Sequence, residues 1–166
     1  GAAAKLDAEE LTLQRGDVEL GALVTRVVGR HRPIAQQHAV SIDAAIPEHP
    51  LLARADVTLL EQAVSNVVYN AVRHNRPRGH VAVLLLELAN DARAGAGPVQ
   101  PRFCVRVLDD GPGVAPELLA RLAERGFRGE RARSRSPEGH GLGLQITKRV
   151  LEAHGMQLRL STPQLG

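Results

Sequence analysis

The sequence predicts one α+β domain, a two-layer α/β sandwich in which about three helices cover one face of a mixed, mostly antiparallel sheet. Three observations predict this. Apolar residues recur at helical spacing in three segments. Strand-like apolar runs lie between those segments, and two of the runs, 80–89 and 102–108, are neighbours in the chain. Neighbouring strands favour an antiparallel pair, so we do not expect a doubly wound parallel sheet.

The composition is that of a globular chain with an aliphatic core. Of the 166 residues 43% are hydrophobic, yet there is no Trp, one Tyr and two Phe, so Val, Leu, Ile and Ala must fill the core. No apolar run approaches membrane-spanning length, and no signal-peptide pattern is present. The single cysteine, Cys104, excludes a disulfide framework or a Cys-rich zinc site and indicates a reducing compartment.

The formal charge of +3 would suit a nucleic-acid binder, but the excess of positive charge is local. Arginines crowd the segment 121–135, with glutamates among them. No aromatic-studded strand accompanies them, as a single-strand binding surface would require. An Arg-rich loop that faces a polyphosphate is the better interpretation.

The segment 59–75 organises the chain. Its apolar residues recur at three- and four-residue steps and predict a helix with one core-facing stripe: Leu60, Ala63, Val64, Val67, Val68, Ala71 and Val72. Asn66 and Asn70 are four residues apart and therefore project from one face. Asn has poor helix propensity, so this pair either satisfies buried backbone groups or binds a ligand. Asp56 is the expected N-cap.

Before this helix we expect short strands at 11–14, 40–46 and 51–55. A further helix is expected from an N-cap at Asp17 to about Gln37, with Pro33 kinking it or ending it early.

After the strand pair at 80–89 and 102–108, which a flexible connection at 91–100 should join, Pro116 marks the start of a short helix. That helix would carry Leu118, Leu119 and Leu122. The remaining expected elements are a long loop at 124–138, a helix at 142–153 ended by His154-Gly155, and a last strand at 156–161.

Two glycine-rich turns carry possible chemistry. The turn Asp109–Gly113 (DDGPG) combines an acceptor-only carboxylate, able to choose adenine over guanine, with glycines that let a ligand approach the backbone. The turn Gly139–Leu144 (GHGLGL) opens a helix, whose first N–H groups can bind an anion. Each is weak alone: the first is a common structural turn, and the second lacks the Lys and Ser/Thr of a Walker loop.

In order and spacing, these segments together resemble the catalytic and ATP-binding (HATPase_c) domain of bacterial two-component sensor histidine kinases. That domain belongs to the superfamily of gyrase, heat-shock chaperone, kinase and mismatch-repair ATPases. The resemblance covers 11–161: 56–71 looks like the N box, 107–113 the G1 box, 139–144 the G2 box, and 148–155 the helix end after G2. It implies the Bergerat ATP-binding fold, a lid at about 124–140, ATP and Mg²⁺ as cofactors, and protein-histidine kinase activity.

The resemblance also implies roles for individual residues. Asn70 matches the family's Mg²⁺ ligand, and Asn66 stands where the hydrolysing ATPases carry a general-base Glu, which favours a kinase. Asp109 matches the adenine-reading carboxylate. Arg73 and His74 match positions near the phosphates and the adenine, although a solvated helix end is the open alternative for both. The other implied ATP contacts are Gly111, Gly113, Arg125, Phe127, Arg128, Gly139, His140, Gly141, Leu142, Gly143 and Leu144. For any single lid arginine, a solvated loop position is equally open.

The chain departs from the family pattern in three places. The Phe-x-x-Phe of the F box is reduced to Phe127, and Gly126 beside it should make the lid more mobile. His140 replaces the usual Thr or Ser of the G2 box. None of the 7 histidines is followed by the phosphoacceptor pattern of the dimerisation helix, so no residue of this chain is expected to be the nucleophile.

The expected partners are therefore the dimerisation and phosphoacceptor histidine domain of a parent kinase and a response-regulator receiver domain. We expect no nucleic acid and no membrane contact by this fragment. The expected organisation is a linker or remnant at 1–10 and a cytoplasmic catalytic domain at 11–166, cut from a longer inner-membrane sensor, with the usual final strand missing after Ser161.

Three other functions stay open at this point. A protein-serine kinase of the anti-sigma type should carry a carboxylate at position 66, where this chain has Asn. The reduced F box would suit a non-catalytic nucleotide-sensing or protein-docking module. A basic nucleic-acid binder would show a steep salt dependence.

Overall fold

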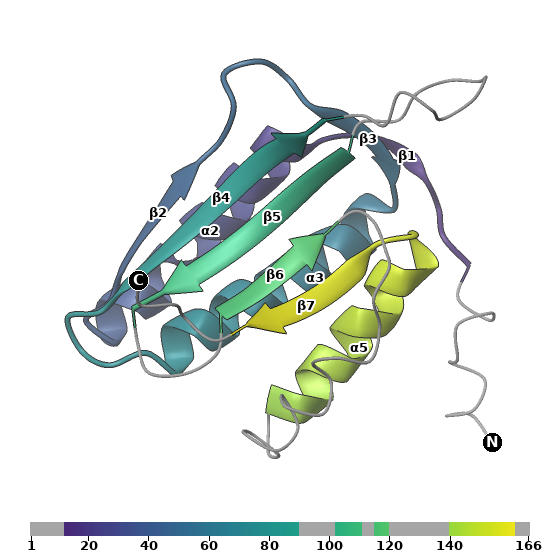
Figure 1. Cartoon of the computed structure of the whole chain (residues 1–166). Coiled ribbons are helices and arrows are strands. Elements are labelled where there is room, and N and C mark those ends of the chain that lie inside the picture. The colour runs from purple at the N-terminus through teal and green to yellow at the C-terminus, as the bar shows by residue number, and fades with distance from the viewer. Residues whose placement is uncertain (1–11, 90–101, 111–114, 120–139, 162–166) are drawn as a thin grey trace.

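Figure 1 shows the computed structural model, which describes residues 12–89, 102–110, 115–119 and 140–161. The helices and strands of this part are, in order, β1 (Gly16–Glu19), α2 (Leu20–Gln37), β2 (Ser41–Ala45), β3 (Leu52–Ala55), α3 (Val57–Arg73), β4 (His80–Leu88), β5 (Arg102–Asp109), β6 (Ala115–Leu119), α5 (His140–Ala153) and β7 (Gln157–Ser161). The expected connection at 91–100, the loop at 124–138 and Leu122 lie outside the described residues.

The sheet is mixed and mostly antiparallel. Its strand order is β2-β4-β5-β6-β7, in which β2 and β4 are parallel and all other neighbours are antiparallel. β1 and β3 form a separate antiparallel pair. The helices form the second layer, in which α3 packs against both α2 and α5 (Figure 1). The predicted two-layer α+β sandwich is confirmed.

The core lies between the helices and the sheet and is mainly aliphatic. All seven residues of the stripe predicted on 59–75 are buried on α3: Leu60, Ala63, Val64, Val67, Val68, Ala71 and Val72. They pack with the buried residues of α2 and with alternate residues of β4 and β5, such as Val83 and Val107. Because α3 sits in the middle of the helix layer, its position is fixed from three sides.

The predicted start of the first helix is wrong. Residues 12–15 form no regular element, and the strand begins only at Gly16. Asp17 lies inside that strand opposite Arg54, so it cannot cap α2. Glu19 is the cap instead: its carboxylate accepts hydrogen bonds from the backbone N–H groups of Gly21 (3.1 Å) and Ala22 (3.0 Å). It also accepts one from Leu51 (2.9 Å), and this bond is the main reason why the pKa of Glu19 is lowered.

Pro33 does not end α2, which continues to Gln37. A proline inside a helix removes the hydrogen bond to the carbonyl group four residues earlier, here that of Gly29. Pro33 and Gly29 are both exposed, so water can bind the freed carbonyl group. The missing bond therefore costs too little to end the helix.

The predicted short helix at Pro116 is also wrong, because residues 115–119 form strand β6. This strand pairs with β5 on one side and β7 on the other. Its pairing with β5 begins only at Glu117, so Pro116, which has no N–H group, needs no partner on that side. Pairing on both sides outweighs the local helix signal of a proline followed by leucines.

The predicted end of the last helix is confirmed. Gly155 has φ +78°, the left-handed conformation that favours glycine. The N–H of Met156 donates to the carbonyl oxygen of Leu151 (2.8 Å), and the N–H of Gly155 donates to that of Glu152 (3.0 Å). This pair of bonds is a Schellman motif, and it turns the chain directly into β7. Within the described ranges, no helix is both long and apolar enough to cross a membrane.

Candidate functional site

Asn66 lies on the side of α3 that faces α5. Its side-chain Nδ2 donates a hydrogen bond to the Oγ1 of Thr147 across 3.2 Å, and Thr147 is 1% exposed. Asn70 follows one turn later on α3 and, like Asn66, is half-buried. The two predicted N-box amides therefore share a face next to the helix that the second glycine turn opens.

Asp56 fixes the start of α3 and confirms the predicted N-cap. Its Oδ1 accepts a hydrogen bond from the N–H of Leu59 (3.1 Å), and its Oδ2 accepts one from the N–H of Gln14 (2.9 Å). The bond from Gln14, followed by that from Leu59, lowers the pKa of the buried Asp56 carboxyl group. The cap thus ties α3 to the segment that enters the domain before β1.

Arg73 and His74 lie at the other end of α3. Arg73 is the last residue of the helix, and His74 is its C-cap, whose N–H donates to the carbonyl oxygen of Asn70 (3.0 Å). Both residues are exposed. The structure places them within one turn of Asn70, which suits a contact with a ligand and equally suits a solvated helix end.

Asp109 ends β5, where it pairs with Val81 of β4 and is half-buried. Its neighbour Asp110 accepts two hydrogen bonds from His80: one from the backbone N–H to Oδ1 (2.8 Å) and one between Nδ1 and Oδ2 (2.9 Å). These bonds lower the pKa of Asp110 to about 2. The His80–Asp110 pair could not be predicted from the sequence, because it depends on the register of β4 against β5.

Within the second glycine turn, the backbone of residues 140–143 forms the first turn of α5. The helix begins at His140, two residues before the expected Leu142. Leu144 is partly buried and packs against the core. The side chains of His140 and Leu142 and the burial of Gly141 and Gly143 lie outside the described part of the structure. The other predicted ATP contacts lie outside the described residues: Gly111, Gly113, Arg125, Phe127, Arg128 and Gly139.

Asn70 is the predicted metal ligand, and its half-buried amide offers one oxygen donor. Across the described ranges, no three His, Cys, Asp or Glu side chains come together in a way that could hold a metal ion. A cation bound by the Asn70 amide oxygen could take waters and phosphate oxygens as its other ligands. Mg²⁺ accepts such a set, since it retains waters and binds substrate phosphates.

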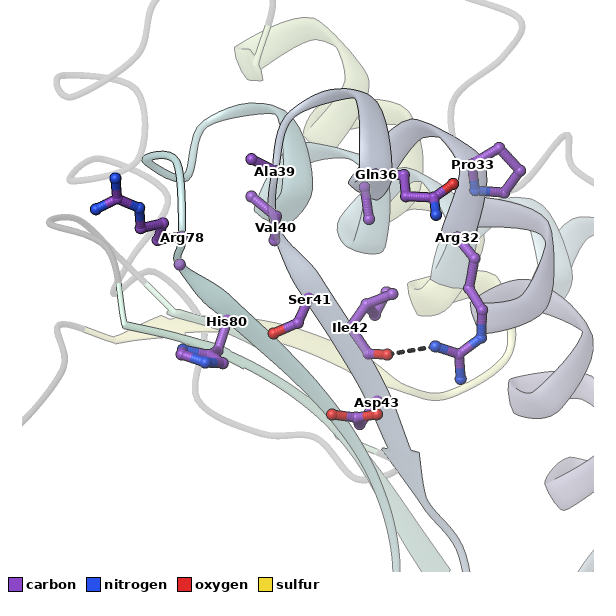
Figure 2. A pocket seen from close by; sticks show the side chains of 12 residues that line it. Arg32, Pro33, Gln36, Ala39, Val40, Ser41, Ile42, Asp43, Arg78 and His80 are labelled. Carbon is purple, nitrogen blue, oxygen red and sulfur yellow. Dashed lines mark hydrogen bonds between the residues drawn. The ribbon is translucent and has the colours of Figure 1, made fainter.

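A cavity of about 660 Å³ lies elsewhere, between the C-terminal half of α2, β2 and the start of β4 (Figure 2). None of the predicted site residues lines it. Arg32 donates from Nη1 to the carbonyl oxygen of Ile42 (2.6 Å), and the guanidinium groups of Arg32 and Arg78 lie at opposite ends of the cavity (Figure 2). Because its cations do not converge, this cavity is a poor anion site and is not the predicted nucleotide site.

Comparison with known proteins gives one family. The profile described as histidine kinase-, DNA gyrase B-, and HSP90-like ATPase (HATPase_c) matches residues 55–166. The sensor-like histidine kinase SenX3 of Mycobacterium tuberculosis is 35% identical over 151 residues, which is 90% of this chain and 34% of that protein. The chain thus spans about a third of the length of this curated relative.

Solved structures agree on the fold. The mycobacterial sensor histidine kinase MprB covers 90% of this chain and 99% of its own, with a TM-score of 0.59 and 21% identity. Full-length ShkA, solved in complex with AMPPNP, covers 98% of this chain and 34% of its own, with a TM-score of 0.62 and 24% identity. At these identities the two structures support the architecture alone.

Proposed function

Because the chain belongs to the histidine kinase-, DNA gyrase B- and HSP90-like ATPase family and is a histidine kinase ATP-binding catalytic domain, we propose that it binds Mg·ATP and donates the γ-phosphate to a histidine on a separate domain. The proposed acceptor lies on the dimerisation domain of a parent sensor kinase. From there the phosphoryl group would pass to a response-regulator receiver domain.

The observation that carries the proposal is the contact between Asn66 of α3 and Thr147 of α5. It brings the N-box face of one helix next to the helix that begins in the G2 box. The first N–H groups of α5 can bind phosphate oxygens, and the Asn70 amide can supply one Mg²⁺ ligand. Asp109, at the end of β5, would read the exocyclic amine of adenine.

The residues of α3 favour phosphoryl transfer to a nucleophile over hydrolysis. An amide cannot take a proton from water, so Asn66 does not provide a general base. A neutral imidazole needs none, since its free lone pair attacks the γ-phosphorus while the bond to the β–γ bridging oxygen breaks and ADP leaves. Positioning and charge stabilisation then supply the catalysis, and Mg²⁺, when bound, neutralises the phosphate oxygens.

We also propose the bounds of the catalytic domain, its lid and the compartment in which it lies. Residues 11–166 would form the catalytic domain, with a lid at about 124–140 whose Arg125, Phe127 and Arg128 close over the triphosphate. We place the domain in the cytoplasm, as part of a longer kinase anchored in the inner membrane. Neither a nucleic acid nor a membrane surface is a proposed partner of this fragment.

Phosphoryl transfer to a supplied acceptor domain tests the proposal. The chain would be mixed with the histidine-bearing dimerisation domain of its parent kinase and with γ-labelled Mg·ATP. Label should accumulate on the acceptor histidine, and Asn70→Ala should slow this on the order of 100-fold, because a Mg²⁺ ligand is lost. Thr58→Ala, a change at an exposed position of the same helix, is the matched control and should transfer at the wild-type rate. Nucleotide binding without transfer would instead indicate a non-catalytic sensing or docking module.

A further inference from the structure

His154, the C-cap of α5, is 9% exposed, and both of its ring nitrogens have partners. Nδ1 lies 2.9 Å from the carbonyl oxygen of Val150, and Nε2 lies 2.9 Å from the backbone nitrogen of Asp56. A carbonyl oxygen only accepts and a backbone N–H only donates. The ring must therefore carry its proton on Nδ1 and accept at Nε2, which makes the imidazole neutral.

This hydrogen bond joins the two helices of the proposed nucleotide site. Asp56 is the N-cap of α3, so the imidazole ties the end of α5 to the beginning of α3. The second tie is the Asn66–Thr147 bond. Thr147 and His154 are seven residues apart, about 10 Å along the helix axis. Two separated points of attachment fix how far α5 can slide or tilt against α3.

We propose that His154 is a positioning residue of the nucleotide site: its neutral imidazole, by holding the α3 N-cap from the end of α5, sets the position of the phosphate-binding start of α5 relative to Asn66 and Asn70. The inference rests on the proposed function, since it assigns His154 a part in that same site. His154 touches neither nucleotide nor metal.

Protonation removes the contact. A protonated ring carries a hydrogen on Nε2, which then faces the hydrogen of the Asp56 N–H, so two donors oppose each other. Burial is the main cause that lowers the pKa of His154, and the positive charge of Arg15 lowers it further. The Asp56 carboxylate and the carbonyl group of Val150 act in the opposite direction. The positioning contact should therefore persist at neutral pH and be lost in acid.

Binding of Mg·ATP to three variants tests the proposal, with the dissociation constant measured by calorimetry where each variant is fully folded. His154→Leu keeps the bulk but leaves the Asp56 N–H without an acceptor, and it should weaken binding on the order of tenfold. His154→Gln restores an acceptor near the position of Nε2 and should recover most of the affinity. Because glutamine has no imidazole to protonate, His154→Gln should also lose less affinity than the wild type as the pH falls.

His31→Leu is the matched control. His31 is 8% exposed and bonds through Nδ1 to the carbonyl oxygen of Val27, four residues earlier, just as His154 bonds to Val150. Its Nε2 faces the Ser65 hydroxyl group, on the side of α3 away from α5. Loss of His31 should lower stability but keep the wild-type affinity and pH profile.

Equal binding by His154→Leu and His31→Leu, or no recovery in His154→Gln, would overturn the positioning role while wild-type binding still supported the proposed function. Failure of the wild type to bind nucleotide would overturn both.

Discussion

His80 holds the carboxylate of Asp110 from two sides, through its backbone N–H at 2.8 Å and its Nδ1 at 2.9 Å. This pair fastens the end of β5 to the start of β4. Asp109, the proposed adenine-reading residue, directly precedes Asp110 in the chain. The direction in which Asp109 points is therefore set partly by a contact that makes no use of its own side chain.

The hydrogen bonds from His80 to Asp110 predict that the protein loses stability in acid as the Asp110 carboxylate is protonated. Because the folded-state pKa of Asp110 is about 2, below its ordinary value of 3.8, its contribution to stability is present above pH 3.8 and is lost as the pH falls towards 2. Carbon-detected NMR titration of the Asp110 carboxyl group should give this low pKa. His80→Ala should raise it part of the way towards 3.8, because the Nδ1 bond is lost while the backbone N–H of residue 80 still donates. An unchanged pKa in His80→Ala would contradict the assigned cause.

Two glycines, one just after helix α5 and one inside helix α2, predict stability changes of opposite sign. Gly155→Ala places a side chain where φ is +78° and should destabilise the protein by about 1 to 2 kcal/mol, although no atom lies within 4 Å of the added Cβ. Gly29→Ala in α2 has the same open surroundings without a positive φ, so it should stabilise the protein by about 0.5 to 1 kcal/mol. Urea unfolding measures both changes, and a loss of stability in Gly29→Ala would be unexpected on this basis.

Asn66→Glu should convert part of the kinase reaction into hydrolysis. The new carboxylate would stand on the face of α3 next to Thr147, whose hydroxyl group can donate to it. As a general base it should raise ATP hydrolysis in the absence of an acceptor domain by about tenfold or more. Phosphate release is the measurement, and Asn66→Gln, which keeps an amide, is the control. Equal hydrolysis by the two variants would argue against a nucleotide bound at this face.

The sequence predicts those parts of the fold that depend on local periodicity. The apolar stripe of α3 matches its buried face residue for residue, and the strands β2, β3, β4, β5 and β7 lie within one residue of their expected ends. A long segment with a periodic apolar pattern buries its apolar face whatever the fold of the rest of the chain. The local pattern is therefore sufficient to predict these helices and strands.

Elements that depend on distant partners could not be predicted in this way. Residues 115–119 pair with β5 and β7, and this pairing overrides a helix-like local sequence. Asp17 cannot cap α2 because it lies in the pairing of β1 with β3, and Glu19, the actual cap, accepts a third hydrogen bond from Leu51, far along the chain.

The features of the site fall into the same two groups: residues that local spacing predicts, and contacts that depend on a distant partner. Asn66, Asn70 and Asp56 follow from spacing on one helix, whereas the bond between Asp56 and His154 joins residues 98 positions apart. Nothing in the sequence near either residue indicates that pair.

The most direct test of the central claim is a titration of this chain with ATP and with GTP, each with and without Mg²⁺, for the wild type, Asp109→Asn and Asp43→Asn. Asp43 is an exposed carboxylate on β2 and serves as the control. The account predicts Mg²⁺-dependent binding of ATP, at least about tenfold weaker binding of GTP, and a similar loss in Asp109→Asn alone, because one charged hydrogen-bond acceptor is removed. Equal binding of GTP and ATP, or wild-type affinity in Asp109→Asn, would contradict it.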